Sequence, residues 1–396
     1  MIRAILCMLA VLVPAGGFAA EKAKKKPGKP LVLAFYHPCH GTPWGPSKEW
    51  KGWDSRVFPG KYDPSKMSGE RREIASGDYP LIGPYDTSDP EIVRWHMKLA
   101  RAAGIDGLIV SWWKSPKPDK LYDWQASLFE KVILPSAESE GMKVCVLDEY
   151  AHYAEDFDAL VSRASDHLPG FAAHPAYLRV NDQPVWFVYQ VGDDWLTPPK
   201  ALEYCRAVEK KVGPVYWIFD RMRAVPTDEP GFPDGMRLKA EDLWLAIPEI
   251  DCVGSRGLYG HVRATGYEEQ RLLFEDYTQS VRASGKAVML PISPGRSNFA
   301  ASDEPIIVSR RDGAQYRDSI RAAKAAGPDI IAVRSFNEWQ EMTGIEPSTT
   351  YRDPFMYLKI TATIRGAKWK TPAFPSLRSL DPAAVSRVGT GIVIYE

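Results

Sequence analysis

The sequence lacks several features that would identify a function directly. Its 396 residues contain 50 basic and 50 acidic side chains, so there is no excess of positive charge for binding nucleic acid. It contains no G-x-S-x-G motif and no phosphate-binding glycine loop of the P-loop or dinucleotide type. A hydrolase with a serine nucleophile, a kinase and a dehydrogenase are therefore poorly supported.

Cysteine is also scarce, with five residues in the whole chain. Cys7 lies inside an apolar run at the N-terminus, and the other four are widely spaced, three of them in apolar contexts typical of strands or helices. We expect buried thiols, with disulfide pairing as the alternative in an oxidising compartment. These four residues are Cys39, Cys145, Cys205 and Cys252.

The N-terminal apolar run is too short to span a membrane comfortably. It follows a charged start at Arg3 and ends in small residues, which is typical of a secretory signal cut after Ala19 or Ala20. We therefore expect a signal peptide over residues 1–20 and a basic disordered leader over residues 21–29. The mature protein would be secreted or periplasmic, without a membrane span.

The rest of the chain alternates between apolar strand patterns and helical patterns, and no linker interrupts the alternation. Eight strands and intervening helices predict a single (β/α)8 barrel over residues 30–369, with long loops after the strands. A C-terminal extension, residues 370–396, would add a strand at 391–395 or be loosely attached. The predicted strands are 31–36, 107–112, 144–147, 185–189, 215–219, 250–253, 287–292 and 330–333, and the predicted helices are 90–103, 124–137, 156–167, 200–211, 267–284, 315–325 and 356–364.

Polar and aromatic residues collect just after each predicted strand, where a barrel of this type forms its active site. The 13 tryptophans and 18 tyrosines of the chain also favour carbohydrate, because sugar rings stack on aromatic faces. Each strand end has an ordinary alternative, since strand ends meet solvent in any case. Taken together they predict a pocket of carboxylates and rings, the equipment of glycoside cleavage. These residues are His37, His40, Ser111, Trp112, Trp113, Asp148, Glu149, Tyr150, Tyr189, Gln190, Asp220, Arg221, Tyr259, His261, Arg296, Asn298, Asn337, Glu338, Trp339 and Glu341.

Residues 330–347, IIAVRSFNEWQEMTGIEP, carry the strongest local signal. The run of β-branched residues reads as a strand buried on both faces. If the chain turns helically after Trp339, Glu338 and Glu341 lie on one face with Cβ atoms roughly 5–6 Å apart. When two carboxyl groups lie this near to each other, the pKa of one is raised and the pKa of the other is lowered. One group is then prepared to donate a proton and the other to accept one. The alternative is a pair of solvated carboxylates, which is common at this spacing.

His37 and His40 have the H-x-x-H spacing of some metal sites. Pro38 breaks the local geometry, and no second ligand pair of standard spacing follows. We therefore do not predict a zinc site.

Six segments of the chain resemble glycoside hydrolase family 99, the endo-α-1,2-mannosidases and endo-α-1,2-mannanases. They appear in the family's order and span most of the mature chain. The segments are AFYHP at 34–38, YPLIGPYDTSDPEIVRWHM at 79–97, AGIDGLIVSWW at 103–113, HPAYLRVNDQPVWFVY at 174–189, PDIIAVRSFNEWQE at 328–341 and IEP at 345–347.

The resemblance implies a (β/α)8 barrel and a retaining reaction through a 1,2-anhydro sugar. Glu338 resembles the family's glutamate that deprotonates the sugar 2-hydroxyl, and Glu341 resembles its acid and base. Glu149 looks like a pocket carboxylate, Tyr189 and Tyr259 resemble substrate-binding tyrosines, and no metal or organic cofactor is implied. For Glu149 two further readings stay open, an ordinary carboxylate nucleophile and a structural carboxylate that holds a tyrosine or an arginine.

The chain also departs from the family's pattern. Gln340, Met342 and Gly344 stand where the family has His, Gly and Gln, and Tyr150 stands where it has Pro. We expect these changes to alter pocket shape more than reaction type. Two functions follow, an exported endo-acting α-glycosidase on a mannan-like glycan and a non-hydrolytic relative that binds glycan or serves surface-polysaccharide biosynthesis. Retention of both glutamates favours the first.

Overall fold

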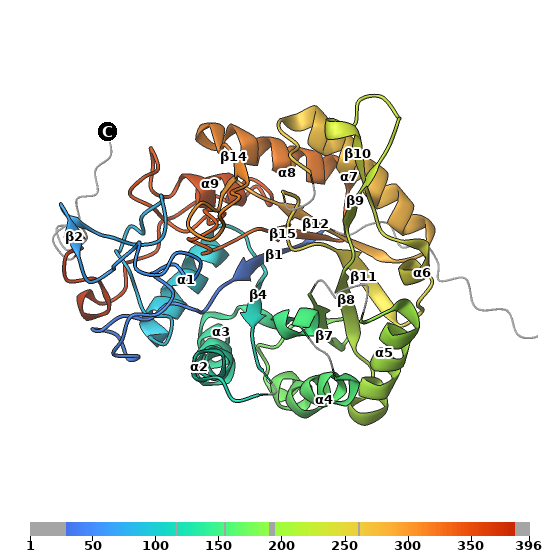
Figure 1. Ribbon diagram of the computed structural model, residues 1–396, viewed down its shortest axis with the longest axis horizontal. Coiled ribbons are helices and arrows are strands. Elements are labelled where there is room, and N and C mark those ends of the chain that lie inside the picture. Colours follow the sequence, from blue (N-terminus) through green and yellow to red (C-terminus); the bar gives the residue numbers. More distant parts are fainter. Residues whose placement is uncertain (1–28, 116, 154–155, 190–194, 260–261, 385–396) are drawn as a thin grey trace, which may run out of the picture.

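The structure, a computed structural model, describes residues 29–115, 117–153, 156–189, 195–259 and 262–384. Figure 1 shows the strands gathered at the centre with helices around them. Eight parallel strands follow one another in the order β5, β4, β1, β15, β12, β11, β8 and β7, and a further pairing of β5 with β7 closes the barrel. The predicted (β/α)8 barrel is confirmed. The strands are β1 (Leu31–Tyr36), β4 (Gly107–Trp112), β5 (Lys143–Asp148), β7 (Gln183–Val188), β8 (Tyr216–Asp220), β11 (Ile250–Gly254), β12 (Ala287–Ile292) and β15 (Ile330–Val333).

The strands form where short apolar runs are covered on both faces, as expected for parallel sheet. Every residue of β15 is buried. Its partners on either side are β1, where Leu31 pairs with Ile330, and β12, where Met289 pairs with the same residue. Each of the eight predicted strands matches one barrel strand to within two residues at either end.

The helices that cover the barrel begin and end at recognisable signals. Helix α1 starts with Pro90, and the Asp89 side chain caps it by accepting a hydrogen bond from the Glu91 backbone N–H. The helices are α1 (Pro90–Ala102), α2 (Lys120–Leu128), α3 (Leu134–Glu140), α4 (Phe157–Ala173), α5 (Pro198–Val212), α6 (Asp242–Leu245), α7 (Tyr267–Ala283), α8 (Ala314–Ala326) and α9 (Met356–Ala362).

The structure also contains elements that the sequence pattern does not indicate. A π-helix, η1 (Phe129–Ile133), joins α2 to α3 where one helix over 124–137 was predicted. Strands of two to four residues give too little periodicity to detect. They pair as β2 (Met67–Ser68) with β3 (Arg71–Arg72), β9 (Arg223–Pro226) with β10 (Met236–Lys239), β13 (Arg296–Ser297) with β14 (Ile307–Val308), and β6 (Arg179–Val180) with β7.

The long segment after β1 lies beside the segment after β15, and these are the blue and red parts of Figure 1. The Leu81 N–H donates to the Pro347 carbonyl at 2.9 Å, and Pro80 bridges to Ser348. The beginning of the C-terminal extension packs here too, since Arg72 Nε donates to the Asp381 carboxylate at 2.9 Å. The predicted signal, most of the leader and the predicted strand at 391–395 lie outside the described residues.

Of the four cysteines, Cys145, Cys205 and Cys252 are buried thiols, as predicted, and Cys39 is partly buried and unpaired. Over the described ranges, no helix has the length and apolar character required to cross a bilayer.

The barrel strands approach closely at Gly254, the last residue of β11. A Cβ atom there would lie 2.5 Å from the Met289 backbone oxygen on β12, whereas one at Gly170 in α4 would meet nothing within 4 Å. We expect Gly254→Ala to lower the free energy of unfolding by about 1–3 kcal/mol through overpacking. Gly170→Ala is the matched control and should raise it by about 1 kcal/mol, because alanine favours helix. Thermal unfolding of both variants checks this, and equal midpoints would contradict it.

Candidate active site

The segment after β15 forms a compact turn that carries two glutamates. The Ser335 N–H donates to the Thr343 carbonyl at 2.9 Å, and the Met342 N–H donates to the Trp339 carbonyl at 3.1 Å. The chain does not continue as a helix after Trp339, so the helical spacing considered for the pair is not what brings it together. Glu338 and Glu341 instead reach the same cavity because the turn folds back on itself. We call residues 335–343 the glutamate turn.

Asn337 fixes this turn to the segment after β1. Its Oδ1 accepts from the His37 backbone N–H at 2.8 Å, and its Nδ2 donates to the His37 carbonyl at 3.0 Å. Asn337 is fully buried, so both bonds are shielded from water.

A buried carboxylate supports the turn from beneath. Glu346 is fully buried, and its Oε2 accepts from Tyr85 Oη at 2.6 Å and from Trp339 Nε1 at 3.2 Å. Its Oε1 lies 3.3 Å from His96 Nε2. Trp339 is thereby held in the protein interior rather than in the cavity.

Glu338 contacts a neutral histidine. Its Oε2 lies 3.1 Å from His37 Nδ1, and burial together with Arg334 and Arg256 holds the pKa of His37 well below its usual range. Arg334 Nη1 lies 3.0 Å from His37 Nε2, and an arginine can only donate, so Nε2 is the acceptor of this hydrogen bond. The ring proton of His37 is therefore on Nδ1, which donates a hydrogen bond to Glu338 Oε2. Burial, then the charge of Glu341, raises the pKa of Glu338 to about 7.

Glu341 has the opposite environment, although it belongs to the same turn. Its Oε2 accepts from Arg334 Nη2 at 2.5 Å, and its Oε1 accepts from Arg296 Nη2 at 3.3 Å. Burial alone would raise its pKa, but Arg334, Arg296 and Arg256 outweigh burial and lower the pKa to about 2. Glu341 therefore ionises first as pH rises, and Glu338 keeps its proton to a higher pH.

Glu149 follows β5 and is buried beside Ser111 and Arg256. Ser111 Oγ donates to its Oε1 at 2.9 Å, and Arg256 Nη1 lies 3.0 Å from each of its two oxygens. The Arg256 guanidinium in turn lies 4.4 Å from the centre of the Tyr189 ring. Glu149 thus forms an ion pair with Arg256, and the Tyr189 ring packs against the Arg256 guanidinium.

These carboxylates line one cavity of about 240 Å³ at the C-terminal ends of the strands. One wall is aromatic, because Trp113 stacks on Tyr122 with ring centres 5.3 Å apart and planes 15° apart. A cavity with three carboxylates, amides and a stacked aromatic wall can bind a sugar and transfer protons to it. Its lining residues are His37, Cys39, His40, Gly52, Arg56, Ser111, Trp113, Tyr122, Gln125, Glu149, Arg256, Ala301, Glu338, Gln340 and Glu341.

Several residues expected at the site do not line this cavity. Trp112 follows Ser111 on β4 and points to the opposite face, where it packs on Trp186 with ring centres 5.7 Å apart. Tyr259 is buried, and its hydroxyl accepts from Gln315 Nε2 of α8 at 2.7 Å. Asn337 and Trp339 support the glutamate turn from behind, so Glu149 and Trp113 are the expected binding residues that face the cavity, with Tyr189 one contact away.

His37 and His40 have separate environments. His37 lies between Glu338 and Arg334, whereas the His40 ring packs on Trp53 with ring centres 4.3 Å apart. Within the ranges that the structure describes, no group of three or more His, Cys, Asp and Glu side chains is arranged to hold a metal ion.

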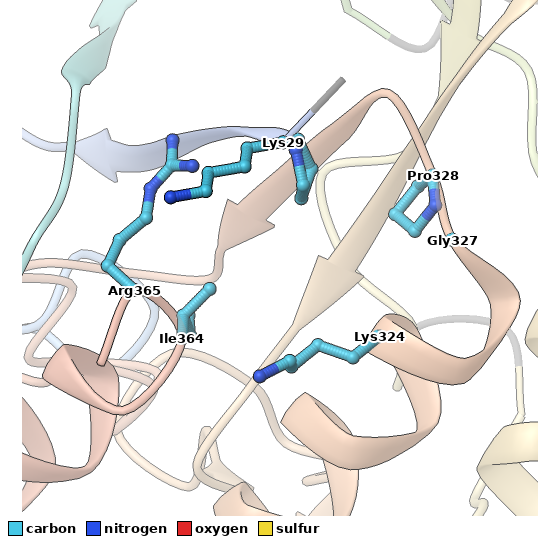
Figure 2. Close-up of a pocket in the computed structure, with 7 residues that line it drawn as sticks. Lys29, Lys324, Gly327, Pro328, Ile364 and Arg365 are labelled. Carbon is cyan, nitrogen blue, oxygen red and sulfur yellow. The ribbon is translucent and has the colours of Figure 1, made fainter. Parts of the chain in front are cut away.

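A second cavity, of about 340 Å³, lies at the other end of the barrel and is shown in Figure 2. It opens where β1 and β15 begin, and carboxylates are absent from the described residues that line it. This cavity therefore lacks the pair of carboxyl groups that glycoside cleavage uses. The lining residues are Lys29, Pro30, Lys324, Gly327, Pro328, Ile364 and Arg365.

Comparison with known proteins agrees with this geometry. The model of Glycosyl hydrolase family 99 matches residues 29–206. The rat glycoprotein endo-alpha-1,2-mannosidase is 23% identical over 360 residues, which covers 84% of this chain and 73% of the rat protein. The human glycoprotein endo-alpha-1,2-mannosidase-like protein is 23% identical over 369 residues, which covers 83% and 73%. The chain is therefore similar to glycoside hydrolase family 99, at the low identity of a divergent relative.

A solved structure extends the likeness to the fold. The family 99 endo-alpha-mannosidase from Bacteroides thetaiotaomicron aligns with a TM-score of 0.63 and 22% identity, over 85% of this chain and 96% of that chain. With these likenesses, the protein is a glycoside hydrolase that acts on a glycan.

Two arginines of this site, Arg334 and Arg256, were not predicted from the sequence, whereas Arg296 was among the predicted strand-end residues. Arg334 directly follows β15, and Arg256 lies two residues after β11. Their positions just after strands are the signal that could have identified them.

The ion pair between Arg256 and Glu149 can be tested by removing its partners singly and together. Arg256→Gln leaves a buried carboxylate without its cation, and we expect a loss of about 2–3 kcal/mol in the free energy of unfolding. Arg256→Gln with Glu149→Gln should recover part of that loss, since no charge remains uncompensated. Arg352→Gln is the control, because the Arg352 side chain is 84% exposed and its Nη1 lies 3.6 Å from Asp312 Oδ2. This substitution should cost under about 1 kcal/mol. Denaturant titration measures all of these, and additive single losses would contradict the pairing.

Proposed function

We propose that the protein is an exported, endo-acting, retaining α-glycoside hydrolase that cleaves a mannan-like polysaccharide or glycan through a 1,2-anhydro sugar. The observation that carries the proposal is the glutamate turn, in which two carboxyl groups of one cavity differ in pKa by several units. The motif positions of Glu338 and Glu341 and the printed names of the curated relatives support α-1,2-linked mannose as the substrate class.

The reaction needs one base and one acid. The base removes the proton of the sugar 2-hydroxyl, and that oxygen attacks the anomeric carbon as the bond to the leaving oxygen breaks. The acid gives its proton to the leaving oxygen. Water then opens the anhydro ring with the former acid acting as base, and two inversions retain the anomeric configuration.

Glu149 serves in this proposal as a binding and positioning carboxylate. Both of its oxygens lie 3.0 Å from Arg256 Nη1, and one also accepts from Ser111. A nucleophilic carboxylate would have to leave this guanidinium to reach an anomeric carbon. Glu149 instead orients Arg256 and the substrate hydroxyls near it.

The roles of the two glutamates have two possible assignments. The motif resemblance gives Glu338 the 2-hydroxyl and makes Glu341 the acid. The charges of the free protein favour the exchange, because Glu338 is the group of the pair that can carry a proton near neutral pH, whereas Glu341 is held ionised between two guanidiniums. Glu341 is then left to accept the proton of the 2-hydroxyl, although its lowered pKa makes it a weak base. We favour the exchanged assignment and treat the motif assignment as its competitor.

Export rests on the N-terminal sequence, whose charged start, short apolar run and small residues are typical of a secretory signal. A secreted or periplasmic location suits degradation of polysaccharide. The alternative, a non-hydrolytic relative that binds glycan or serves its biosynthesis, is less favoured because both acid and base groups are present and oppositely protonated.

The first experiment compares wild type with Glu338→Gln and Glu341→Gln on a panel of α-mannans and other α-linked polysaccharides. We expect each variant to lose about a hundredfold or more in rate, the typical contribution of an acid or base. Proton NMR of the first product should show retention of configuration for wild type. Glu304→Gln, an exposed glutamate outside the cavity, is the control and should behave as wild type. Inversion, or full activity in either variant, would refute the proposed mechanism.

Two measurements separate the role assignments. If Glu338 is the acid, it must be protonated, so kcat/KM is highest below its pKa and falls as pH rises through about 7. If Glu338 is the base, kcat/KM rises through the same pH. A substrate with a good leaving group, such as a glycosyl fluoride, needs no acid. It should therefore restore cleavage to Glu338→Gln and leave Glu341→Gln inactive, and the reverse pattern would support the motif assignment.

A further inference from the structure

Arg56 differs from the other arginines of the active site in having no carboxylate partner. Arg256 pairs with Glu149, and Arg334 and Arg296 share Glu341. Within the described residues, Arg56 makes no ion pair, although it lines the same cavity and its side chain is exposed. Its guanidinium is therefore available to an anion that enters from solvent.

The guanidinium is held in place by an aromatic ring. Arg56 Nη1 donates to Tyr122 Oη at 3.2 Å, and the guanidinium carbon of Arg56, Cζ, lies 5.4 Å from the centre of the Tyr122 ring. Tyr122 stacks on Trp113, whose Nε1 donates to Ser111 Oγ at 3.1 Å. Trp113 and Tyr122 thus give a stacked aromatic pair with a cation at its edge. Such a pair can receive an apolar sugar face while the guanidinium binds a negative substituent.

The backbone that carries Arg56 is anchored to the catalytic machinery. Ser55 Oγ donates to the Ala300 carbonyl at 2.5 Å. Gln340, between the two glutamates, donates from Nε2 to the Gly52 carbonyl at 3.1 Å and to the Asp54 carbonyl at 2.7 Å. Arg56 is therefore placed relative to Glu338 and Glu341 by direct hydrogen bonds, and a substituent bound there would fix the register of the glycan.

We propose that Arg56, Tyr122 and Trp113 form a subsite for a sugar that bears an anionic group, a carboxylate or a sulfate ester. The substrate is then an acidic α-glycan rather than a neutral mannan. This inference rests on the proposed glycosidase function for its substrate class, but the subsite binds its ligand whether or not cleavage follows. Both groups present oxygens that a guanidinium fork can bind in a bidentate way.

The test measures binding by isothermal titration calorimetry in the Glu338→Gln background, which separates binding from turnover. The probes are α-1,2-linked mannotetraose, the same oligosaccharide with a glucuronic acid branch, and its 6-O-sulfated form. We expect at least one acidic probe to bind about tenfold more tightly than the neutral one at low ionic strength, with the advantage shrinking as salt rises. The acidic probe with the larger gain in affinity shows whether the subsite prefers a carboxylate or a sulfate ester.

Two added variants connect this preference to Arg56. Arg56→Gln should reduce the tenfold preference to about one, and Arg56→Lys, which keeps the charge but loses the fork, should retain an intermediate preference. Arg352→Gln removes an exposed positive charge outside the cavity and should keep the full preference. The proposal would be overturned if the protein with Arg56 intact bound all three probes equally or bound neither acidic probe. It would also be overturned if Arg56→Gln lowered the affinity for all three probes by the same factor.

Turnover by the protein with both glutamates intact separates the two conclusions. Acidic probes that bind through Arg56 but are not cleaved would keep the subsite and refute the hydrolase mechanism. Cleavage of the neutral probe with no acidic preference would keep the mechanism and refute the subsite.

Discussion

The structure of the site depends on one side chain amide that joins two distant parts of the chain. Asn337 bonds both the N–H and the carbonyl of His37, 300 residues earlier, and it does so where water is excluded. The backbone groups of two irregular segments are satisfied together, which a buried loop otherwise achieves poorly. Glu338 is next to Asn337, and His37 is the residue that contacts Glu338. The hydrogen bonds that hold the loops together therefore also position Glu338 against His37.

The second organising principle is the unequal distribution of positive charge around equivalent carboxyl groups. Glu341 lies between the guanidiniums of Arg334 and Arg296, and Glu338 faces an imidazole that burial, Arg334 and Arg256 keep neutral. Arg334 thus acts twice, as the cation for Glu341 and as the donor that fixes the tautomer of His37. Two glutamates three residues apart acquire different pKa values because Arg334 and Arg296 both pair with Glu341.

The sequence was informative where a single physical rule governs a whole element. The barrel strands are short apolar runs that need cover on both faces, so β15 and its neighbours could be predicted almost to the residue. The sequence could not predict in which direction the side chains at and beyond the strand ends point. Ser111 and Trp112 are adjacent, yet one lines the cavity and the other packs on Trp186, because a strand alternates its faces and the sequence does not say which face is which. Trp339 looks like a sugar platform, but the buried carboxylate of Glu346 draws its indole N–H inward.

The residues that depart from the family's pattern acquire a common explanation in the structure. Gln340 binds the backbone of the loop that carries Arg56. Met342 adopts a φ of 50°, and Arg310 binds its carbonyl and that of Gly344. Three of the four departures, Gln340, Met342 and Gly344, therefore lie in the glutamate turn or directly after it and engage backbone hydrogen bonds. Only Gln340 of these three lines the cavity, and Glu338 and Glu341 line it beside Gln340. Changes of this kind are expected to alter which sugar substituents fit in the cavity more than the reaction itself.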